Sequence, residues 1–343
     1  MLRAVQVGLG VWGRDWAARV IPEVPQVDVA GYIDPDPDAM ALARKMAGIP
    51  TERCFSTLEQ AFEATRPDAV LVTTSLNAHV PIIRAALEAG KHVLVEKPFA
   101  PSGAEARDVV ELARVQDVVL MVSQNYRFFP AARAVTGLVR DRELGEVREV
   151  AIDFRRPPTA GGGRRGGHHG FAQPLLVDMA IHHFDLLRLV LGGEAQEVFC
   201  RVWNPSGSGF DGPPAGAAII EFDRGVVVSY RGSWISRGPT TPWAGEWRME
   251  LEGGEIAWTS RGPVGDDSAD RVEVRPLGEA AREIELPRLS HIDRAGTLVE
   301  FAAAVEAGRE PECSGRENLG SVALMEAAVE SATAGRPVGL DLE

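Results

Sequence analysis

The sequence has little cysteine and very little lysine. Its three cysteines, Cys54, Cys200 and Cys313, are far apart and show no CxxC or Cys/His spacing. A disulfide framework and a cysteine-based metal site are therefore not expected. The only lysines are Lys45, Lys91 and Lys97, and apart from histidine every other basic side chain is arginine. A lysine at a functional position is consequently informative.

Long apolar runs and excess positive charge are also missing. No run of about eighteen uninterrupted apolar residues occurs, so no membrane-spanning helix is expected. The chain begins directly with the strand-like run Leu2–Val7, without a basic segment followed by an apolar one, and we expect a cytoplasmic protein. The formal net charge of −13 disfavours the basic surface that nucleic-acid phosphates require. We expect neither a membrane nor a nucleic acid as partner.

A length of 343 residues accommodates two domains, each with its own core. Residues 1–123 alternate short apolar strands with amphipathic helical stretches. This alternation predicts βαβ units and a doubly wound parallel sheet of the Rossmann type, hence an α/β dinucleotide-binding domain. The predicted strands are Val5–Val7, Val27–Ile33, Ala69–Thr73, His92–Val95 and Val118–Val122.

Residues 124–343 have a different pattern. After a helix near Pro130–Arg140, strand-like runs follow one another, interrupted by helical stretches such as Pro174–Leu191. The pattern predicts an α+β domain with a large, mostly antiparallel open sheet, for substrate binding and oligomerisation. The segment 159–170, rich in glycine, arginine and histidine, is either a surface loop or a basic lid over a ligand.

A glycine motif, GLGVWG, occupies Gly8 to Gly13 between the first strand and the first helix. In that context Gly8 allows a tight turn, Gly10 lets the backbone approach a pyrophosphate, and Gly13 permits close packing of helix on strand. The helix N-terminus adds partial positive charge for the phosphates. The motif predicts a nicotinamide dinucleotide site.

An acidic residue, Asp34, ends the second predicted strand. Its carboxylate can accept hydrogen bonds from an adenosine ribose hydroxyl and would repel a 2′-phosphate. No arginine sits next to it to receive such a phosphate, so the sequence favours NAD over NADP. Asp36 and Asp38 are interpreted as turn and helix-cap residues.

The fourth predicted strand leads into Glu96, Lys97 and Pro98. Ligands of doubly wound sheets gather at the carboxyl ends of strands, which places these residues beside the cofactor. A lysine there can hold a substrate hydroxyl or share its proton. Arginine cannot take this role, because its pKa is too high for it to exchange protons in the useful range. The alternative is a surface lysine before a turn proline.

A second polar cluster lies in a strongly apolar helix. Spacings of four and three residues place Asp178, His182 and Asp185 on one helical face. A histidine beside a carboxylate can take a proton from an alcohol. The same set could be a satisfied buried cluster, and a zinc site is disfavoured because no cysteine or HExxH pattern accompanies it. His183 is interpreted as a packing or interface residue.

These motifs together resemble the glucose–fructose oxidoreductase / inositol dehydrogenase / rhizopine-catabolism (Gfo/Idh/MocA) family over nearly the whole chain. The resemblance is carried by the glycine turn, by Glu96-Lys97-Pro98, by Asn125-Tyr126-Arg127, and by Asp178 with His182 and Asp185. Gly232-Ser233-Trp234 and the segment from Ser331 to Val338 extend it.

The resemblance implies NAD(P)-dependent oxidation or reduction at a carbinol carbon of a sugar, polyol or related cyclic compound. It implies that Lys97 contacts substrate and cofactor, that His182 is the acid/base and that Asp178 orients substrate or histidine, with Arg127 as a further substrate contact. It also implies a cis peptide before Pro98 and a homodimer or homotetramer through the second sheet, without metal. The expected cofactor contacts are Gly8, Gly10, Val11, Trp12, Gly13, Asp34, Thr74, Asn77, His79, Glu96, Lys97 and Asn125.

The sequence departs from the family pattern where substrate would be recognised. Thr74-Ser75-Leu76-Asn77 replaces a Thr-Pro-Asn loop, and Phe171-Ala172-Gln173-Pro174 replaces a glycine run. Trp243 and Trp247 could stack on a sugar or be packing residues. Two other functions stay open: an NAD-retaining glycosidase or lyase that oxidises transiently, and a non-catalytic NAD-binding regulator. The intact set of Lys97, Asp178 and His182 argues against the regulator.

Overall fold

The computed structural model describes residues 1–158, 171–262 and 269–340. Two compact units divide the chain: Met1–Asn125 with His291–Leu319, and Tyr126–Ser290 with Gly320–Glu343. The first break lies two residues beyond the predicted limit at residue 123. Residues 291–319, which the sequence assigned to the second domain, belong to the first unit. The reason is a backbone contact between distant segments, in which the Val122 amide donates to the Cys313 carbonyl at 2.8 Å.

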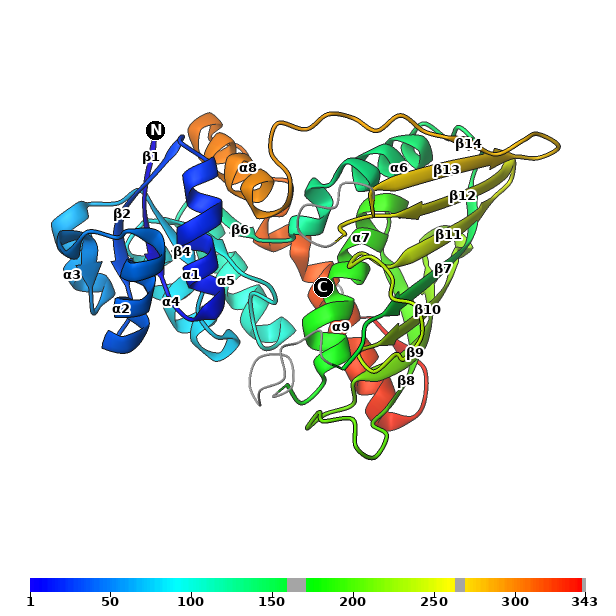
Figure 1. The fold of residues 1–343 in the computed structure, drawn as a ribbon, viewed down its shortest axis with the longest axis horizontal. Coiled ribbons are helices and arrows are strands. Elements are labelled where there is room, and N and C mark those ends of the chain that lie inside the picture. Colours follow the sequence, from blue (N-terminus) through cyan, green and yellow to red (C-terminus); the bar gives the residue numbers. More distant parts are fainter. Residues whose placement is uncertain (159–170, 263–268, 341–343) are drawn as a thin grey trace. The chain divides into compact units, whose positions relative to one another are not determined.

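The first unit contains a six-stranded sheet in the order β3-β2-β1-β4-β5-β6 (Figure 1). All of its strand pairs are parallel, and the strands are almost wholly apolar and buried, as expected of a sheet covered on both faces. The predicted doubly wound sheet is confirmed. Its strands are β1 (Leu2–Val7), β2 (Val27–Ile33), β3 (Cys54–Phe55), β4 (Ala69–Val72), β5 (His92–Val95) and β6 (Leu120–Val122).

Three helices of the first unit, α2, α3 and α5, begin at side-chain caps that the sequence supplies. The Asp36 carboxylate accepts from the Asp38 amide at 2.9 Å, which confirms the predicted cap. At the start of α5, Ser102 Oγ accepts from the Glu105 amide at 3.3 Å and donates to the Glu105 carboxylate at 2.8 Å. The helices are α1 (Val11–Asp15), which continues as a π-helix (Trp16–Val20), α2 (Pro37–Ala47), α3 (Leu58–Thr65), α4 (Leu76–Glu88), α5 (Gly103–Val115) and α8 (Asp293–Ala307).

The second unit contains a nine-stranded sheet in the order β14-β13-β12-β11-β7-β10-β9-β8-β15. Only the β7–β10 pair is parallel among its strand pairs in the described residues. The predicted, mostly antiparallel sheet is confirmed. Its strands are β7 (Val147–Arg155), β8 (Ala195–Trp203), β9 (Ala215–Phe222), β10 (Val227–Ser233), β11 (Glu246–Leu251), β12 (Gly254–Thr259), β13 (Arg271–Pro276), β14 (Arg282–Glu283) and β15 (Val338–Gly339).

Helices cover one face of this second sheet, among them α6 (Pro130–Arg140) and α7 (Ile181–Leu191), and Figure 1 shows no helix on its other face in the described part of the chain. A π-helix (Pro174–Ala180) leads into α7, and α9 (Gly315–Ala334) has residues in both units. Burial alternates along β9 and β10, as expected of a sheet with one covered face.

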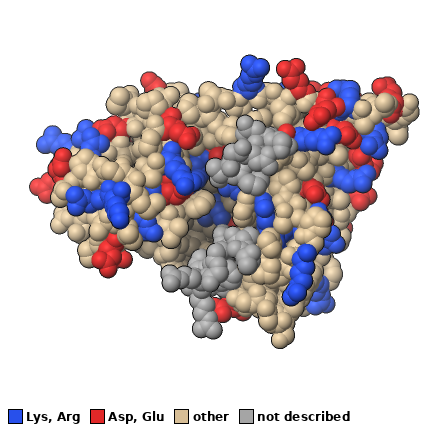
Figure 2. All heavy atoms as spheres, in the orientation of Figure 1, with Lys and Arg blue, Asp and Glu red and all other residues tan. Residues whose placement is uncertain are grey.

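Two further observations concern the surface. On the face shown in Figure 2, basic and acidic side chains are interspersed among neutral residues, and neither sign forms a broad patch. Among the described residues no helix is both long enough and apolar enough to cross a membrane.

Candidate cofactor and catalytic site

The glycine turn after β1 is tight and open on one side. Gly8 has φ +93°, and a Cβ at this position would lie 2.5 Å from the Thr74 side chain. A Cβ at Gly13 would lie 1.9 Å from the Gly8 carbonyl oxygen, whereas a Cβ at Gly10 would meet nothing within 4 Å. Gly8 and Gly13 are therefore needed for the turn itself, and Gly10 faces the space that a pyrophosphate requires.

Two buried polar side chains, one in β1 and one directly after β4, hold this turn in place. The Gln6 amide donates from Nε2 to the Gly13 carbonyl at 2.8 Å and to Thr73 Oγ1 at 3.0 Å. Thr73 Oγ1 donates to the Gly8 carbonyl at 2.7 Å. Neither residue was predicted from the sequence, although a glutamine inside an apolar strand is a signal that a buried partner is needed.

Asp34 follows β2 and is tied to the glycine turn. Its Oδ2 accepts from the Leu9 amide at 2.6 Å, and its Oδ1 accepts from the Asp36 amide at 2.9 Å. The carboxylate also borders a hollow of about 220 Å³, the kind of space that the adenosine end of a dinucleotide occupies at a Rossmann sheet. Its lining comprises Asp34, Pro35, Pro37, Met40, Ala41, Arg44, Cys54, Phe55 and Ser56.

Arg44 corrects one expectation. The sequence showed no arginine next to Asp34, but α2 brings Arg44 to the same hollow. Arg44 donates from Nε to the Ile49 carbonyl at 3.4 Å and from Nη2 to Thr51 Oγ1 at 2.5 Å. A cation thus lies close to the acid that was expected to exclude a 2′-phosphate.

The candidate cofactor residues converge because of the strand order. β1 and β4 are neighbours although two strands separate them in sequence, so the connections leave this point in opposite directions. Ligands of such sheets bind there, outside the carboxyl ends of the strands. Gly8, Asp34, Thr74 and Glu96 follow β1, β2, β4 and β5. This arrangement fits a dinucleotide, with the glycine turn for its pyrophosphate and Asp34 for its ribose.

Glu96 and Lys97 follow β5, with the predicted cis peptide between Lys97 and Pro98. Glu96 is buried; its Oε1 accepts from Trp16 Nε1 at 2.7 Å and its Oε2 from the Lys97 amide at 3.3 Å. Glu96 therefore anchors the backbone of Lys97 to the first helix.

His79 connects the loops that follow β4 and β5. Its Nδ1 lies 2.9 Å from the Pro98 carbonyl and its Nε2 lies 3.2 Å from the Thr74 carbonyl. Burial lowers the pKa of His79. A neutral imidazole donates through one nitrogen only, so it satisfies one of these two carbonyls at a time. We interpret His79 as a residue that positions the Lys97 and Thr74 loops.

The returning segment 291–319 adds residues that local patterns did not indicate. Asn125, an expected cofactor contact, donates from Nδ2 to Asp293. The Arg294 guanidinium lies 4.3 Å from the ring centroid of Trp12, within the glycine motif, and donates to Asp15 Oδ2 at 2.5 Å. The remaining expected contacts Val11 and Asn77 are exposed at the starts of α1 and α4.

The second unit holds the predicted acid/base residues. Asp178 and His182 are both buried. Asp178 lies in the π-helix, whereas His182 lies in α7. Because a π-turn is wider than an α-turn, the α-helical spacing that predicted Asp178 on one face with His182 and Asp185 does not apply to Asp178. The His182 imidazole stacks on the Tyr126 ring with centroids 4.0 Å apart.

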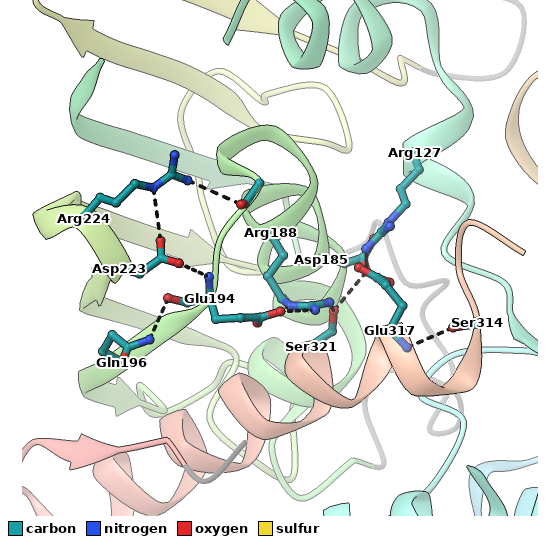
Figure 3. A network of polar contacts seen from close by, with 11 residues as sticks. Arg127, Asp185, Arg188, Glu194, Gln196, Asp223, Arg224, Ser314, Glu317 and Ser321 are labelled. Carbon is teal, nitrogen blue, oxygen red and sulfur yellow. Dashed lines mark hydrogen bonds and ion pairs between the residues drawn. The ribbon is translucent and has the colours of Figure 1, made fainter. Parts of the chain in front are cut away.

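Arg127 and Asp185 form a buried ion pair in the second unit. Arg127 donates from Nε to Asp185 Oδ2 at 2.6 Å and from Nη2 to Oδ1 at 2.7 Å. Ser321 donates to the same carboxylate at 3.0 Å and accepts from Arg188 (Figure 3). With its side chain 2% exposed, Arg127 holds the Asp185 carboxylate inside the unit, and its expected contact with substrate stays a prediction.

His183 and Trp247 are buried in the second unit. The ring nitrogens of His183 lie 3.2 Å from Tyr230 Oη and 3.1 Å from the Trp243 carbonyl, in agreement with its predicted packing role, and burial lowers its pKa to about 4. Trp247 is buried against Trp258 with ring centroids 4.6 Å apart, so it is a packing residue. Trp243 is half-buried.

Three further features concern the 159–170 segment, metal binding and the cysteines. The segment 159–170 lies outside the described residues. In the part of the chain that the structure describes, no group of three or more His, Cys, Asp or Glu side chains is arranged to hold a metal ion, and the three cysteines are free thiols.

Two family models match the chain. Residues 2–124 match the oxidoreductase family with NAD-binding Rossmann fold, and residues 132–256 match the GFO/IDH/MocA C-terminal domain. The two matches cover the glycine turn, Lys97, Asp178 and His182.

Named relatives and solved structures agree with these models. The chain is 28% identical to inositol 2-dehydrogenase from Rhizobium meliloti, covering 83% of this chain and 84% of that protein. It is 28% identical to 1,5-anhydro-D-fructose reductase from Ensifer adhaerens, with 80% of each chain covered. The crystal structure of an oxidoreductase from Agrobacterium radiobacter in complex with NAD+, L-tartaric acid and magnesium has a TM-score of 0.85 over 98% of each chain at 22% identity.

Proposed function

The chain belongs to the GFO/IDH/MocA family of NAD-binding oxidoreductases, and we propose that it exchanges a hydride between NAD and a carbinol or carbonyl carbon of a sugar, polyol or related cyclic compound. The observation that carries this proposal is the meeting of Gly8, Asp34, Thr74 and Lys97 at the carboxyl ends of the parallel strands. Bound NAD supplies the hydride acceptor, and the substrate must be brought to the same edge of the sheet.

The residues of this chain have separate tasks in the proposal. The Lys97 ammonium donates a hydrogen bond to the substrate oxygen and stabilises the negative charge that develops on it. His182 takes the hydroxyl proton during oxidation and returns it during reduction. Asp178 orients the substrate or the imidazole. Lys97 is suited to its task because Glu96 fixes its backbone amide, and His182 because Tyr126 fixes the plane of its ring.

Net oxidation or reduction is proposed in preference to the two alternatives. The relatives named above are a dehydrogenase and a reductase, which supports net redox chemistry over a glycosidase or lyase that oxidises only transiently. The presence of Lys97, Asp178 and His182 supports an enzyme over a regulator. A cytoplasmic location stays a prediction from the sequence.

We further propose that the outer face of the second sheet joins copies of the chain into a homodimer or homotetramer. A hollow of about 540 Å³ lies on this face, lined by Ala151, Phe199 and Ile219 together with charged side chains such as Arg201 and Arg231. Ile219 is 46% and Val227 is 40% exposed. Exposed apolar residues gathered on an uncovered sheet face are typical of an interface.

The function is tested by mixing purified protein and NAD with a panel of sugars and polyols and following the absorbance of reduced nicotinamide. Lys97→Ala and His182→Ala should each lower kcat by about a hundredfold or more, the usual contribution of a positioned proton-transfer group. Lys45→Ala, which removes an exposed lysine of α2, is the matched control and should retain activity. Unchanged kcat in both site variants would refute these roles, and cleavage of a glycoside without net reduced cofactor would favour the alternative chemistry.

A further inference from the structure

Three side chains gather at one end of the second sheet. Arg156 follows β7, Trp243 precedes β11 and Arg261 follows β12. The strand register places them at the same end, because Glu246 at the start of β11 pairs with Asp153 near the end of β7 and with Thr259 at the end of β12. The guanidinium carbon of Arg156 lies 4.1 Å from the Trp243 ring centroid, and that of Arg261 lies 5.6 Å from it. Both guanidinium groups therefore lie near the Trp243 indole.

Arg156 is buried, and it forms no ion pair with any residue that the structure describes. The residue is 8% exposed, and within the described residues neither its Nε nor its Nη2 has a hydrogen-bond acceptor. Burial lowers the pKa of Arg156. The positive charge of Arg261 lowers this pKa further, whereas Tyr126 raises it. A buried guanidinium without an acceptor is unfavourable, and proteins normally supply a partner.

Two other buried arginines of the same unit show which group binds the side of a guanidinium formed by Nε and Nη2. Arg127 uses Nε and Nη2 to hold the Asp185 carboxylate, and Arg188 uses the same two nitrogens to hold Glu194, at 2.7 and 2.5 Å (Figure 3). The atoms that lack an acceptor in Arg156 are those same two. This edge of a guanidinium matches the two oxygens of a planar carboxylate.

We propose that Arg156 holds the carboxylate of the substrate through Nε and Nη2, and that the substrate is consequently a polyhydroxy acid. This inference rests on the proposed oxidoreductase function and specifies its substrate class. Arg261 contributes a second positive charge and connects the subsite to the acid/base residue: it donates from Nη1 to Tyr126 Oη at 2.8 Å, and the Tyr126 ring stacks on His182. Trp243 supplies the apolar surface on which the cation rests.

A matched pair of compounds tests the carboxylate directly. D-Gluconate and D-sorbitol share a six-carbon polyhydroxy chain and differ in one terminal carboxylate. Isothermal titration of each into NADH-saturated protein should show gluconate binding at least tenfold more tightly than sorbitol. Sorbitol 6-phosphate distinguishes a carboxylate from a phosphate, and tighter binding of this compound than of gluconate would overturn the assignment to a carboxylate.

Substitutions then locate the effect at Arg156. Arg156→Gln should remove the preference for gluconate, and Arg156→Lys, which keeps the charge but loses the paired donors, should weaken gluconate binding at least tenfold. The control is Arg237→Gln, which removes one exposed positive charge from the same unit and should leave gluconate affinity unchanged. Equal affinity for gluconate in wild type and Arg156→Gln would refute the proposal.

Thermal stability separates a ligand-binding arginine from a structural one. Arg156→Gln removes an uncompensated buried charge, so its unfolding midpoint without ligand should equal or exceed that of wild type. Arg127→Gln leaves Asp185 buried without its cation and should lower the midpoint. A fall in Arg156→Gln as large as that in Arg127→Gln would assign Arg156 a structural role instead.

Different outcomes would overturn the carboxylate subsite and the oxidoreductase function. Protein that binds NADH and oxidises a neutral polyol, but shows no gluconate preference, overturns the carboxylate subsite and leaves the oxidoreductase function intact. Protein that does not bind NADH, measured by the change in nicotinamide fluorescence, overturns the proposed function on which the subsite rests.

Discussion

The Tyr126 ring lies parallel to the His182 imidazole, with centroids 4.0 Å apart and an angle of 2° between the planes. The Arg261 guanidinium carbon lies 4.5 Å from the centroid of the same Tyr126 ring. A flat contact of this kind fixes the plane of the imidazole, and thereby the directions in which its nitrogens exchange protons. Tyr126 is therefore interpreted as a positioning residue for the proposed acid/base group.

Removing the ring of Tyr126 should impair proton transfer more than substrate binding. We expect Tyr126→Leu to lower kcat by about tenfold, because small losses of orientation at a reacting group are costly. Tyr126→Phe retains the stacked ring and loses only the hydroxyl that Arg261 contacts, so its kcat should stay near that of wild type. Steady-state kinetics with the best substrate of the panel measure both. Equal losses of kcat in the two variants would show that the hydroxyl, and not the stacking, is what matters.

Asp34 should set the choice between NAD and NADP. Asp34→Ser removes the carboxylate that would repel a 2′-phosphate and leaves Arg44 on the same hollow. We expect the ratio of kcat/KM for NADP to that for NAD to rise by about tenfold or more, corresponding to the loss of one charge-assisted hydrogen bond to ribose. Asp38→Ser, an exposed acid in the first turn of α2, is the control. An unchanged ratio in Asp34→Ser would refute the assignment.

The strands and the glycine turn of the first unit could be predicted because their signals are local. An apolar run of four to seven residues, a glycine motif after it and an acid at the end of the next strand are all read within a short window. The observed β2 and β5 have the predicted bounds, and the space beside Gly10 matches the role that the motif gives it.

Partners from distant segments could not be predicted. Asp293 reaches Asn125, and Arg44 reaches the hollow beside Asp34, through tertiary packing that no local spacing encodes. The same holds for Arg156, whose surroundings depend on the register of β7, β11 and β12. The π-helix around Asp178 was missed because hydrophobic periodicity does not distinguish a widened turn within a longer helical run.

Acid should destabilise the second unit through His183. Burial lowers the pKa of this histidine to about 4, whereas an unfolded histidine has a pKa of about 6.5. Between these values the unfolded chain binds a proton that the folded chain does not, so the free energy of unfolding falls as the pH is lowered from 6.5 to about 4. The contribution is complete above pH ~6.5, and its loss on acidification is on the order of 3 kcal/mol.

Urea unfolding at a series of pH values measures this contribution. His183→Gln keeps polar atoms near Tyr230 and Trp243 but has no proton to gain. The variant should be less stable than wild type at pH ~7, and the difference between the two should shrink as the pH approaches ~4. A difference that stays constant over this range would contradict the assigned pKa of His183.

A charge placed on the outer face of the second sheet should separate the subunits. Ile219 of β9 is 46% exposed and lines the hollow on that face, so Ile219→Glu would place an added carboxylate, which is costly to desolvate, in the proposed interface. Light scattering coupled to size-exclusion chromatography should show a dimer or tetramer for wild type and a smaller species for the variant.

Ile292 is 39% exposed and belongs to the first unit, which makes Ile292→Glu a matched control that should keep the wild-type mass. Because a pairwise contact through this face needs no change within either unit, Ile219→Glu should also retain NADH binding. Loss of that binding together with the mass change would instead indicate misfolding, and an unchanged mass would place the interface elsewhere.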